Sequence, residues 1–300
     1  MLKVAWSNVY AHPLPEGHRF PMEKYSLLPE QLLYEGTLTE GNFFTPGSID
    51  ERWLLNTHHR DYLDRLERLE LSRAEIRAIG FPLTAELVHR EKVIANGSVR
   101  AAVYALQDGV GMNIAGGTHH AFSDRGEGFC LLNDIAITAN YLLENQLVRR
   151  VLVVDMDVHQ GNGTAEIFRG RTDVFTFSMH GEKNFPHRKE KSHLDIGLSD
   201  GTGDREYLCA LTANLPKILE VFEPDFLIYQ CGVDVLASDQ LGRLQLSQNG
   251  LKERDETVLT LAKNNRIPVM CCMGGGYSKR IKDIIEGHAH VFRLAQSLYF

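Results

Sequence analysis

The chain has no excess of positive charge, no long hydrophobic run and no paired-cysteine pattern, and each absence narrows its function. Its 300 residues carry a formal net charge of −7, whereas a general nucleic-acid-binding protein usually has a basic balance. No apolar stretch reaches the roughly 18 residues that mark a membrane span. The first residues lack the apolar segment and small-residue cleavage site of a signal peptide. We therefore expect no nucleic-acid partner, no membrane association and a cytoplasmic location.

The cysteines do not indicate a disulfide framework or a zinc ribbon. There are 5 of them, an odd number, and most lie in apolar segments. Because the cytosol keeps thiols reduced, this pattern predicts buried free thiols. Cys271 and Cys272 lack Cys-x-x-Cys spacing. With 43% apolar and 24% charged residues, and without repeats or low-complexity linkers, the chain is predicted to form one domain over residues 1–300.

Apolar and β-branched runs alternate with helix-like segments along the chain. The predicted strands are Val4–Trp6, Val110–Ile114, Val151–Val154, Val174–Phe177, Phe226–Gln230 and Pro268–Met273. The predicted helices include Thr84–Leu106 (interrupted or eased near Gly97), Asn133–Glu144, Leu251–Lys263 and Ser278–Leu298, and two pieces within Gly203–Phe222 divided near Pro216. This alternation predicts an α/β fold in which a predominantly parallel β-sheet has helices on both faces. Such sheets bind ligands at the carboxyl ends of their strands.

Acidic residues and a histidine follow the strand Val151–Val154 at a spacing of two, as Asp155, Asp157 and His159. Two carboxylates and an imidazole at the end of a buried strand need a counter-charge. Carboxylate and imidazole together are common ligands of zinc or iron(II). Asp234, which follows another strand, is the best candidate for a third ligand. Asp157, His159 and Asp234 would leave one coordination position open for water, as catalytic metal sites require.

Two adjacent pairs of histidines differ in their surroundings. His119–His120 follow a strand and two glycines, whereas His58–His59 open an amphipathic segment and are interpreted as surface residues. Imidazoles are the usual general acids and bases near neutral pH. A buried pair needs orienting partners, and Asp155 and Asn162 are available on the neighbouring loop. We therefore expect His119–His120 to be catalytic.

Three glycines, Gly274–Gly276, end the last predicted strand and precede Tyr277. Glycine lets the backbone approach a ligand closely. A phosphate loop is disfavoured because no Gly-Lys-Ser/Thr sequence follows. The Tyr277 phenol is instead predicted to donate a hydrogen bond to a developing oxyanion.

Together these motifs resemble the histone deacetylase family, within the arginase–deacetylase superfamily. The resemblance runs from about Tyr10 to the end of the chain, in five ordered motifs. They are Gly116-Gly117-Thr118-His119-His120, Gly128-Phe129-Cys130-x-x-Asn133-Asp134, Asp155-x-Asp157-x-His159-x-Gly161-x-Gly163, Gly232-x-Asp234 and Gly274-Gly275-Gly276-Tyr277. Three segments are most similar to the class IV branch and its bacterial relatives: Asp157–Gly163, Ser123–Gly126 and Asp239–Gly242.

The resemblance implies an arginase–deacetylase fold and a zinc-dependent amidohydrolase that removes an acyl group from an acyl-lysine. One zinc per chain (or iron(II) in the cell) would be held by Asp157, His159 and Asp234. His119 and His120 would flank the attacking water, Asp155 would orient His119, and Tyr277 would polarise the amide carbonyl. The residues implied for a potassium ion are Asp155, Asp157, His159, Ser178 and the Met179 carbonyl. Those implied to contact substrate in a narrow tunnel are Gly128, Phe129, Phe185, Leu241 and Gly275.

The sequence leaves several alternatives open. Many deacetylases carry an Asp where this chain has Asn162 beside His120, which places the charge state of His120 in question. The substrate could be an acetylpolyamine or another small acylated amine, or the chain could be an acetoin-utilisation-type protein or a non-catalytic acyl-lysine binding module. A two-manganese ureohydrolase fits badly, because Gly161 and Leu236 stand where extra carboxylates are expected. The oligomeric state is not predicted.

Overall fold

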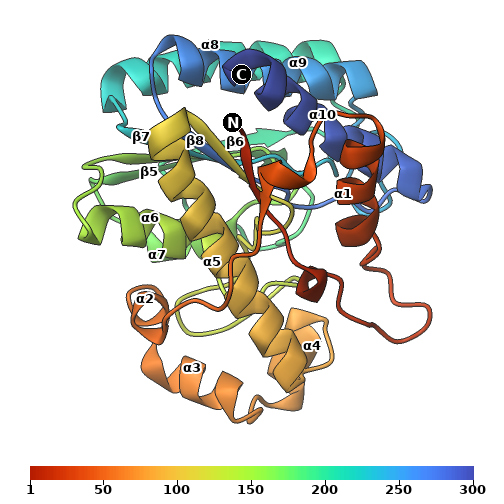
Figure 1. The fold of residues 1–300 in the computed structure, drawn as a ribbon, viewed down its shortest axis with the longest axis vertical. Helices are drawn as coiled ribbons and strands as arrows, with labels where there is room; N and C mark the ends of the chain where they lie inside the picture. Colours follow the sequence, from red (N-terminus) through yellow and green to blue (C-terminus); the bar gives the residue numbers. More distant parts are fainter.

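A single eight-stranded sheet, all of whose strand pairs are parallel, runs through the computed structural model, which describes residues 1–300 (Figure 1). The strand order is β2-β1-β3-β8-β7-β4-β5-β6. The strands are β1 (Lys3–Ala5), β2 (Phe43–Phe44), β3 (Val110–Asn113), β4 (Val151–Asp155), β5 (Val174–Gly181), β6 (Leu194–Leu198), β7 (Phe226–Gln230) and β8 (Val269–Cys272). Strands β3, β4, β7 and β8 are buried along their whole length, as expected for the centre of a parallel sheet.

Helices cover both faces of this sheet, which confirms the predicted fold class (Figure 1). One face carries α1 (Lys24–Tyr34), α8 (Asp204–Phe222), α9 (Gln248–Asn264) and α10 (Ile281–Tyr299). The other carries α5 (Ala85–Asp108), α6 (Asp134–Glu144) and α7 (Asn162–Ile167). Beyond α5 lie the shorter α2 (Glu51–Leu55), α3 (Arg60–Glu67) and α4 (Arg73–Ile79), and two 3-10 turns occupy Asn8–Tyr10 and Glu40–Asn42. None of the helices combines the length and the hydrophobicity needed to cross a membrane.

Local signals explain the boundaries of the longest helix, α5. The Thr84 side chain accepts a hydrogen bond from the Leu87 amide at the start, and Gly109 ends the helix in the left-handed conformation. Gly97 lies within this helix and does not interrupt it, so the predicted break there is wrong. A Cβ on Gly97 would stand 2.3 Å from the Tyr10 hydroxyl, so the glycine allows the N-terminal segment to pack closely against α5.

Two expectations about secondary structure are wrong or incomplete. Helix α8 is continuous through Pro216, because buried Leu211, Leu215 and Leu219 along one face hold it against the core. The sequence pattern also missed β2 and β6, the two edge strands. The first has only two residues, and the second is mostly half-buried or exposed, so neither shows a hydrophobic run.

Candidate metal centre and active site

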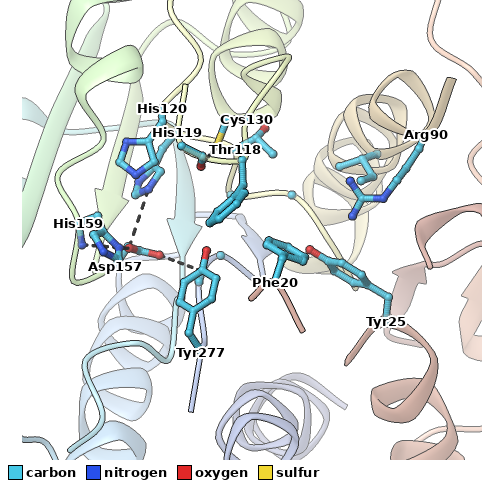
Figure 2. A pocket seen from close by; sticks show the side chains of 17 residues that line it. Phe20, Tyr25, Arg90, Thr118, His119, His120, Cys130, Asp157, His159 and Tyr277 are labelled. Atoms are coloured by element: carbon cyan, nitrogen blue, oxygen red, sulfur yellow. Dashed lines mark hydrogen bonds and ion pairs between the residues drawn. The ribbon is translucent and has the colours of Figure 1, made fainter. Parts of the chain in front are cut away.

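Four neighbouring strands, β3, β8, β7 and β4, end at the same edge of the sheet. Because they are parallel, the loops after them meet there, as predicted. These loops carry His119–His120, Tyr277, Asp234, and the pair Asp157 and His159, respectively. Five of these residues, which lie far apart in the sequence, line one pocket: His119, His120, Asp157, His159 and Tyr277 (Figure 2). Asp234 lies beside them, with its Oδ2 atom 3.1 Å from His159 Nδ1.

Asp157, His159 and Asp234 form the one cluster whose donor atoms lie close enough to hold a metal, all within 4.8 Å of one another. His159 Nδ1 is 3.0 Å from Asp157 Oδ1 and 3.1 Å from Asp234 Oδ2. All three residues are buried. Two carboxylates and one imidazole nitrogen at this spacing suit a divalent metal such as zinc, with a coordination position left open.

The surrounding protein orients these donors. Asp157 Oδ2 accepts hydrogen bonds from Gln230 Nε2 at 2.7 Å and from the Gly275 amide at 2.9 Å. Asp234 Oδ1 accepts from the Val158 amide at 2.9 Å. A Cβ at Gly275 would stand 2.0 Å from Asp234 Oδ2, so this glycine is needed to make room for the donor set.

The pKa values of two of these donors are raised, and this affects how a metal would bind. Burial opposes charge on His159, but its bonds to Asp157 and Asp234 raise its pKa to about 10. Burial and the Asp157 charge raise the pKa of Asp234 to about 7. These groups therefore hold protons that a metal would have to displace, and metal binding becomes tighter as pH rises.

The two histidines of the pair have different partners. His119 Nδ1 is 2.7 Å from Asp155 Oδ2, and His120 Nδ1 is 2.6 Å from Asn162 Oδ1. Burial would lower the pKa of His119, but the Asp155 and Asp157 charges outweigh it and raise that pKa to about 9. Burial, followed by the His119 and His159 charges, holds the pKa of His120 well below its usual value. His120 is therefore the neutral member of the pair.

Tyr277 stands across the pocket from these histidines, with its hydroxyl directed into the space between them (Figure 2). Asp239 accepts a hydrogen bond from the Tyr277 amide at 2.6 Å and so fixes the loop. Behind it the buried Lys24 donates to the Gly274 carbonyl at 3.1 Å. Burial, together with the Asp157 and Asp234 charges, raises the pKa of Tyr277 well above its usual value. The phenol therefore stays protonated and able to donate.

A tight turn forms one wall of the pocket. Glu127 and Cys130 pair across it, and Gly128 and Phe129 between them have φ values of 56° and 66°. A positive φ is strained for phenylalanine and is often retained at functional sites. The Gly128 and Phe129 amides donate to the carbonyls of Ala78 and Ile79 at the end of α4, which holds the turn in place.

The mouth of the pocket, which we define by Arg19, Arg77, Phe129, Phe185, Leu241 and Arg243 with their neighbours, brings the predicted substrate-contacting residues together. Gly128 also lines the mouth, while Gly275 lines the inner pocket. The Phe185 ring stands 4.9 Å from the His120 ring, centroid to centroid. Phe129 and Phe185 therefore lie on the path to the histidines, and their contact with substrate stays a prediction.

The residues expected to hold a second, monovalent ion also lie together. Asp155 pairs with Ser178 across β4 and β5, and Met179 follows on β5. The Ser178 hydroxyl is bonded to His180 Nδ1 at 2.9 Å. All these residues are buried. A potassium site here stays a prediction.

Several residues important to the site were not predicted. Glu127 contacts Asn162, Gln230 contacts Asp157, and Lys24 supports the glycine loop. The buried Arg254 donates to the Met156 and Gly232 carbonyls, on the two loops that carry the metal donors. These residues come from distant segments, so no spacing in the sequence reveals them.

The interpretation of His58–His59 as surface residues is wrong for His58. This residue is only 1% exposed. Its Nδ1 lies 2.9 Å from the Phe122 carbonyl, and its Nε2 accepts from the Asn133 amide at 3.0 Å. His58 thus joins the loop after His119–His120 to the start of α6, whereas His59 is exposed.

The fold and the site together define a class: an α/β protein whose parallel sheet carries, at the carboxyl ends of its strands, a buried Asp-His-Asp donor set that suits a divalent metal. Residues 18–292 match the model of the histone deacetylase domain, and the chain therefore belongs to the histone deacetylase family.

Relatives of known sequence and structure agree. The chain is 42% identical to an uncharacterized protein of Picosynechococcus sp., over 99% of both chains. It is 29% identical to histone deacetylase 2 of Arabidopsis thaliana, covering 89% of this chain and 72% of that protein. It is 32% identical to histone deacetylase clr6 of Schizosaccharomyces pombe, covering 90% and 69%. The structure of a deacetylase homologue from Aquifex aeolicus superposes with a TM-score of 0.85 at 24% identity, covering 99% of this chain and 84% of that one.

Proposed function

We propose that the chain is a zinc-dependent amidohydrolase that removes the acyl group from an acyl-lysine side chain. The observation that carries this proposal is the grouping of a buried Asp-His-Asp donor set, a neutral His120 and a protonated Tyr277 around one pocket. A donor set with an open position, a base and an oxyanion donor are the parts that amide hydrolysis requires.

Each residue of the site has a separate role in this reaction. Zinc held by Asp157, His159 and Asp234 would supply Lewis acidity toward water and the carbonyl oxygen. His120, neutral and oriented through Nδ1, takes a proton from the attacking water and returns one to the leaving amine. His119, kept cationic by Asp155, stabilises negative charge beside it, and Tyr277 donates to the developing oxyanion.

The charge at the mouth supports a protein substrate over an acetylpolyamine. The residues that line it include three arginines and one lysine, Arg19, Arg77, Arg243 and Lys183, and one acidic residue, Glu127. Asp200 pairs with Arg243 at 3.1 Å and with Lys183 at 4.0 Å, but no acidic partner is bonded to Arg19 or Arg77. A polycationic amine would be repelled by this mouth. An acyl-lysine within an acidic segment would be attracted.

The inner pocket supports a short acyl group. Beyond Tyr277 and His119 it extends between Phe20, Tyr25 and Arg90, with a volume of about 40 Å³. This is room for a few water molecules, and a long fatty chain would not fit. We therefore propose acetyl-lysine as the preferred substrate.

The remaining assignments follow from the same residues. We propose one zinc per chain, with iron(II) able to occupy the same donors. A second transition metal is disfavoured, because any side chain at Gly161 would stand 2.4 Å from Asp155 Oδ2 and Leu236 supplies no ligand.

We also propose a potassium site at Asp155 and Ser178. We propose placement in the class IV branch and a single catalytic domain over residues 1–300. Since all five cysteines are free, we propose a cytoplasmic location.

A hydrolysis panel tests the function. Zinc-loaded protein is incubated with acetyl-, propionyl-, octanoyl- and myristoyl-lysine peptides and with acetylputrescine, and the free amine is measured by mass spectrometry. We expect the acetyl-lysine peptide to be hydrolysed fastest. Faster turnover of acetylputrescine would replace the protein substrate by a polyamine, and no turnover of any compound would refute the hydrolase.

A further inference from the structure

We infer that Glu127 is a positioning residue for His120, acting through the side-chain amide of Asn162; this inference rests on the proposed function. The three side chains form a chain of hydrogen bonds. His120 Nδ1 is 2.6 Å from Asn162 Oδ1, and Asn162 Nδ2 donates to Glu127 Oε2 at 3.0 Å. The contact between Asn162 and Glu127 determines the contact between Asn162 and His120, because it fixes the orientation of the Asn162 side-chain amide.

The direction of each bond follows from the chemistry of the groups. An ionised carboxylate can only accept hydrogen bonds, so the amide nitrogen of Asn162 must face Glu127 and its oxygen must face His120. That oxygen can also only accept, so His120 Nδ1 carries a proton. Nε2 is then the basic nitrogen of the neutral ring. Without Glu127 the amide could rotate, and its NH₂ group would favour the opposite tautomer.

His119 has a simpler arrangement, in which one carboxylate contacts the imidazole directly. His119 is oriented directly by the Asp155 carboxylate, and both residues are buried. For His120 the neutral amide of Asn162 occupies the buried position, only 2% exposed. The carboxylate stands one side chain farther out, at the half-buried Glu127. A charge costs less to desolvate there than beside Asp155 and Asp157.

Two rigid elements hold the ends of this chain of hydrogen bonds. Asn162 is the first residue of α7. Glu127 begins the turn that forms the pocket wall, where its amide donates to the Cys130 carbonyl at 3.0 Å and the Cys130 amide donates back at 2.9 Å. The charged or titratable groups that otherwise act on His120 are His119, His159 and Asp157, and the inference leaves their roles unchanged.

The kinetic test compares Glu127→Ala and Glu127→Gln in two backgrounds. Glu127→Ala should lower kcat about 10- to 100-fold, the range for losing a hydrogen bond to a charged group, with KM and zinc content unchanged. Glu127→Gln can accept from Asn162 through its amide oxygen but can also donate through its amide nitrogen, so its activity should lie between that of the wild type and that of Glu127→Ala. In an Asn162→Ala background, Glu127→Ala should cost nothing further. An equal loss in both backgrounds, or a change in KM alone, would overturn the inference.

A second readout needs no substrate. Nitrogen-15 NMR of the histidines in zinc-loaded protein reports the tautomer of each ring. His120 should be protonated at Nδ1 in the wild type and shift toward the other tautomer in Glu127→Ala, with Glu127→Gln between the two. The control Asp124→Asn, which alters an exposed carboxylate on the same loop, should change nothing. An unchanged His120 tautomer in Glu127→Ala overturns the inference, whereas failure of the wild type to hydrolyse any amide refutes only the proposed function.

Discussion

The floor of the pocket, where the metal donors, His119–His120 and Tyr277 lie, and the mouth of the pocket are built from different parts of the sequence. The floor comes from loops that follow four adjacent parallel strands, and each brings its polar residues within a few positions of a strand end. The mouth comes from separate segments around Arg19, Arg77, Lys183 and Arg243. The floor is buried and holds the metal donors, whereas these mouth residues are exposed. Under the proposed function, the loops at the edge of the sheet carry the reaction chemistry, and the segments around them select the substrate.

The largest expected effect, on both metal affinity and turnover, comes from changing a metal donor at the floor with Asp234→Asn. This change removes the charge of one donor, so metal affinity should fall by more than the roughly 10–100-fold seen when only a residue supporting a ligand is changed. Most turnover should be lost. Elemental analysis after dialysis measures the metal, with Asp61→Asn on the exposed face of α3 as the control. Full metal content with full activity would remove Asp234 from the site.

Tyr277→Phe should damage catalysis at the floor without removing the metal. Losing one donor to an oxyanion lowers kcat by about 10²–10³. Zinc content, melting temperature and KM should stay near those of the wild type. If KM rose while kcat was intact, Tyr277 would bind substrate without stabilising the transition state.

Asn162→Asp tests whether residue 162, which lies between the floor and the mouth, controls the pKa of His120. The pH profile of kcat/KM is the measurement. A carboxylate beside His120 would raise its pKa by roughly 1–3 units. Because the base must be neutral, the acid limb of kcat/KM should then move to higher pH. Glu127 would repel the new carboxylate, so the shift should be larger in the Glu127→Gln/Asn162→Asp double variant. An acid limb that stays in place or moves down in the double variant would separate residue 162 from the base.

The smallest effect is expected at the mouth. Acetyl-lysine peptides with flanking Glu should show a higher kcat/KM than those with flanking Lys, by about one and a half- to five-fold per exposed charge pair. The preference should weaken with salt and shrink in Arg77→Glu. Equal rates for both peptides at low salt would mean that the cationic mouth does not select substrate.

The same contrast explains what could be predicted from the sequence. The metal donors, the histidine pair and Tyr277 each stand next to a recognisable strand, and a parallel sheet brings strand ends together. Glu127, Gln230, Lys24 and Arg254 act through single long-range contacts that no periodicity marks. The edge strands and the continuity of α8 also depend on tertiary packing, which overrides local propensity. The burial of His58 is not readable from the sequence for the same reason, since its partners Phe122 and Asn133 lie far along the chain.

The most direct test of the central claim is a titration of metal-stripped protein with zinc while hydrolysis of an acetyl-lysine peptide is followed. A single Asp-His-Asp metal centre predicts no turnover without metal, and a rate that rises linearly and levels off at one zinc per chain. Turnover in the stripped protein, or a plateau reached only at two metals per chain, would contradict a single Asp157, His159 and Asp234 site as the seat of amide hydrolysis.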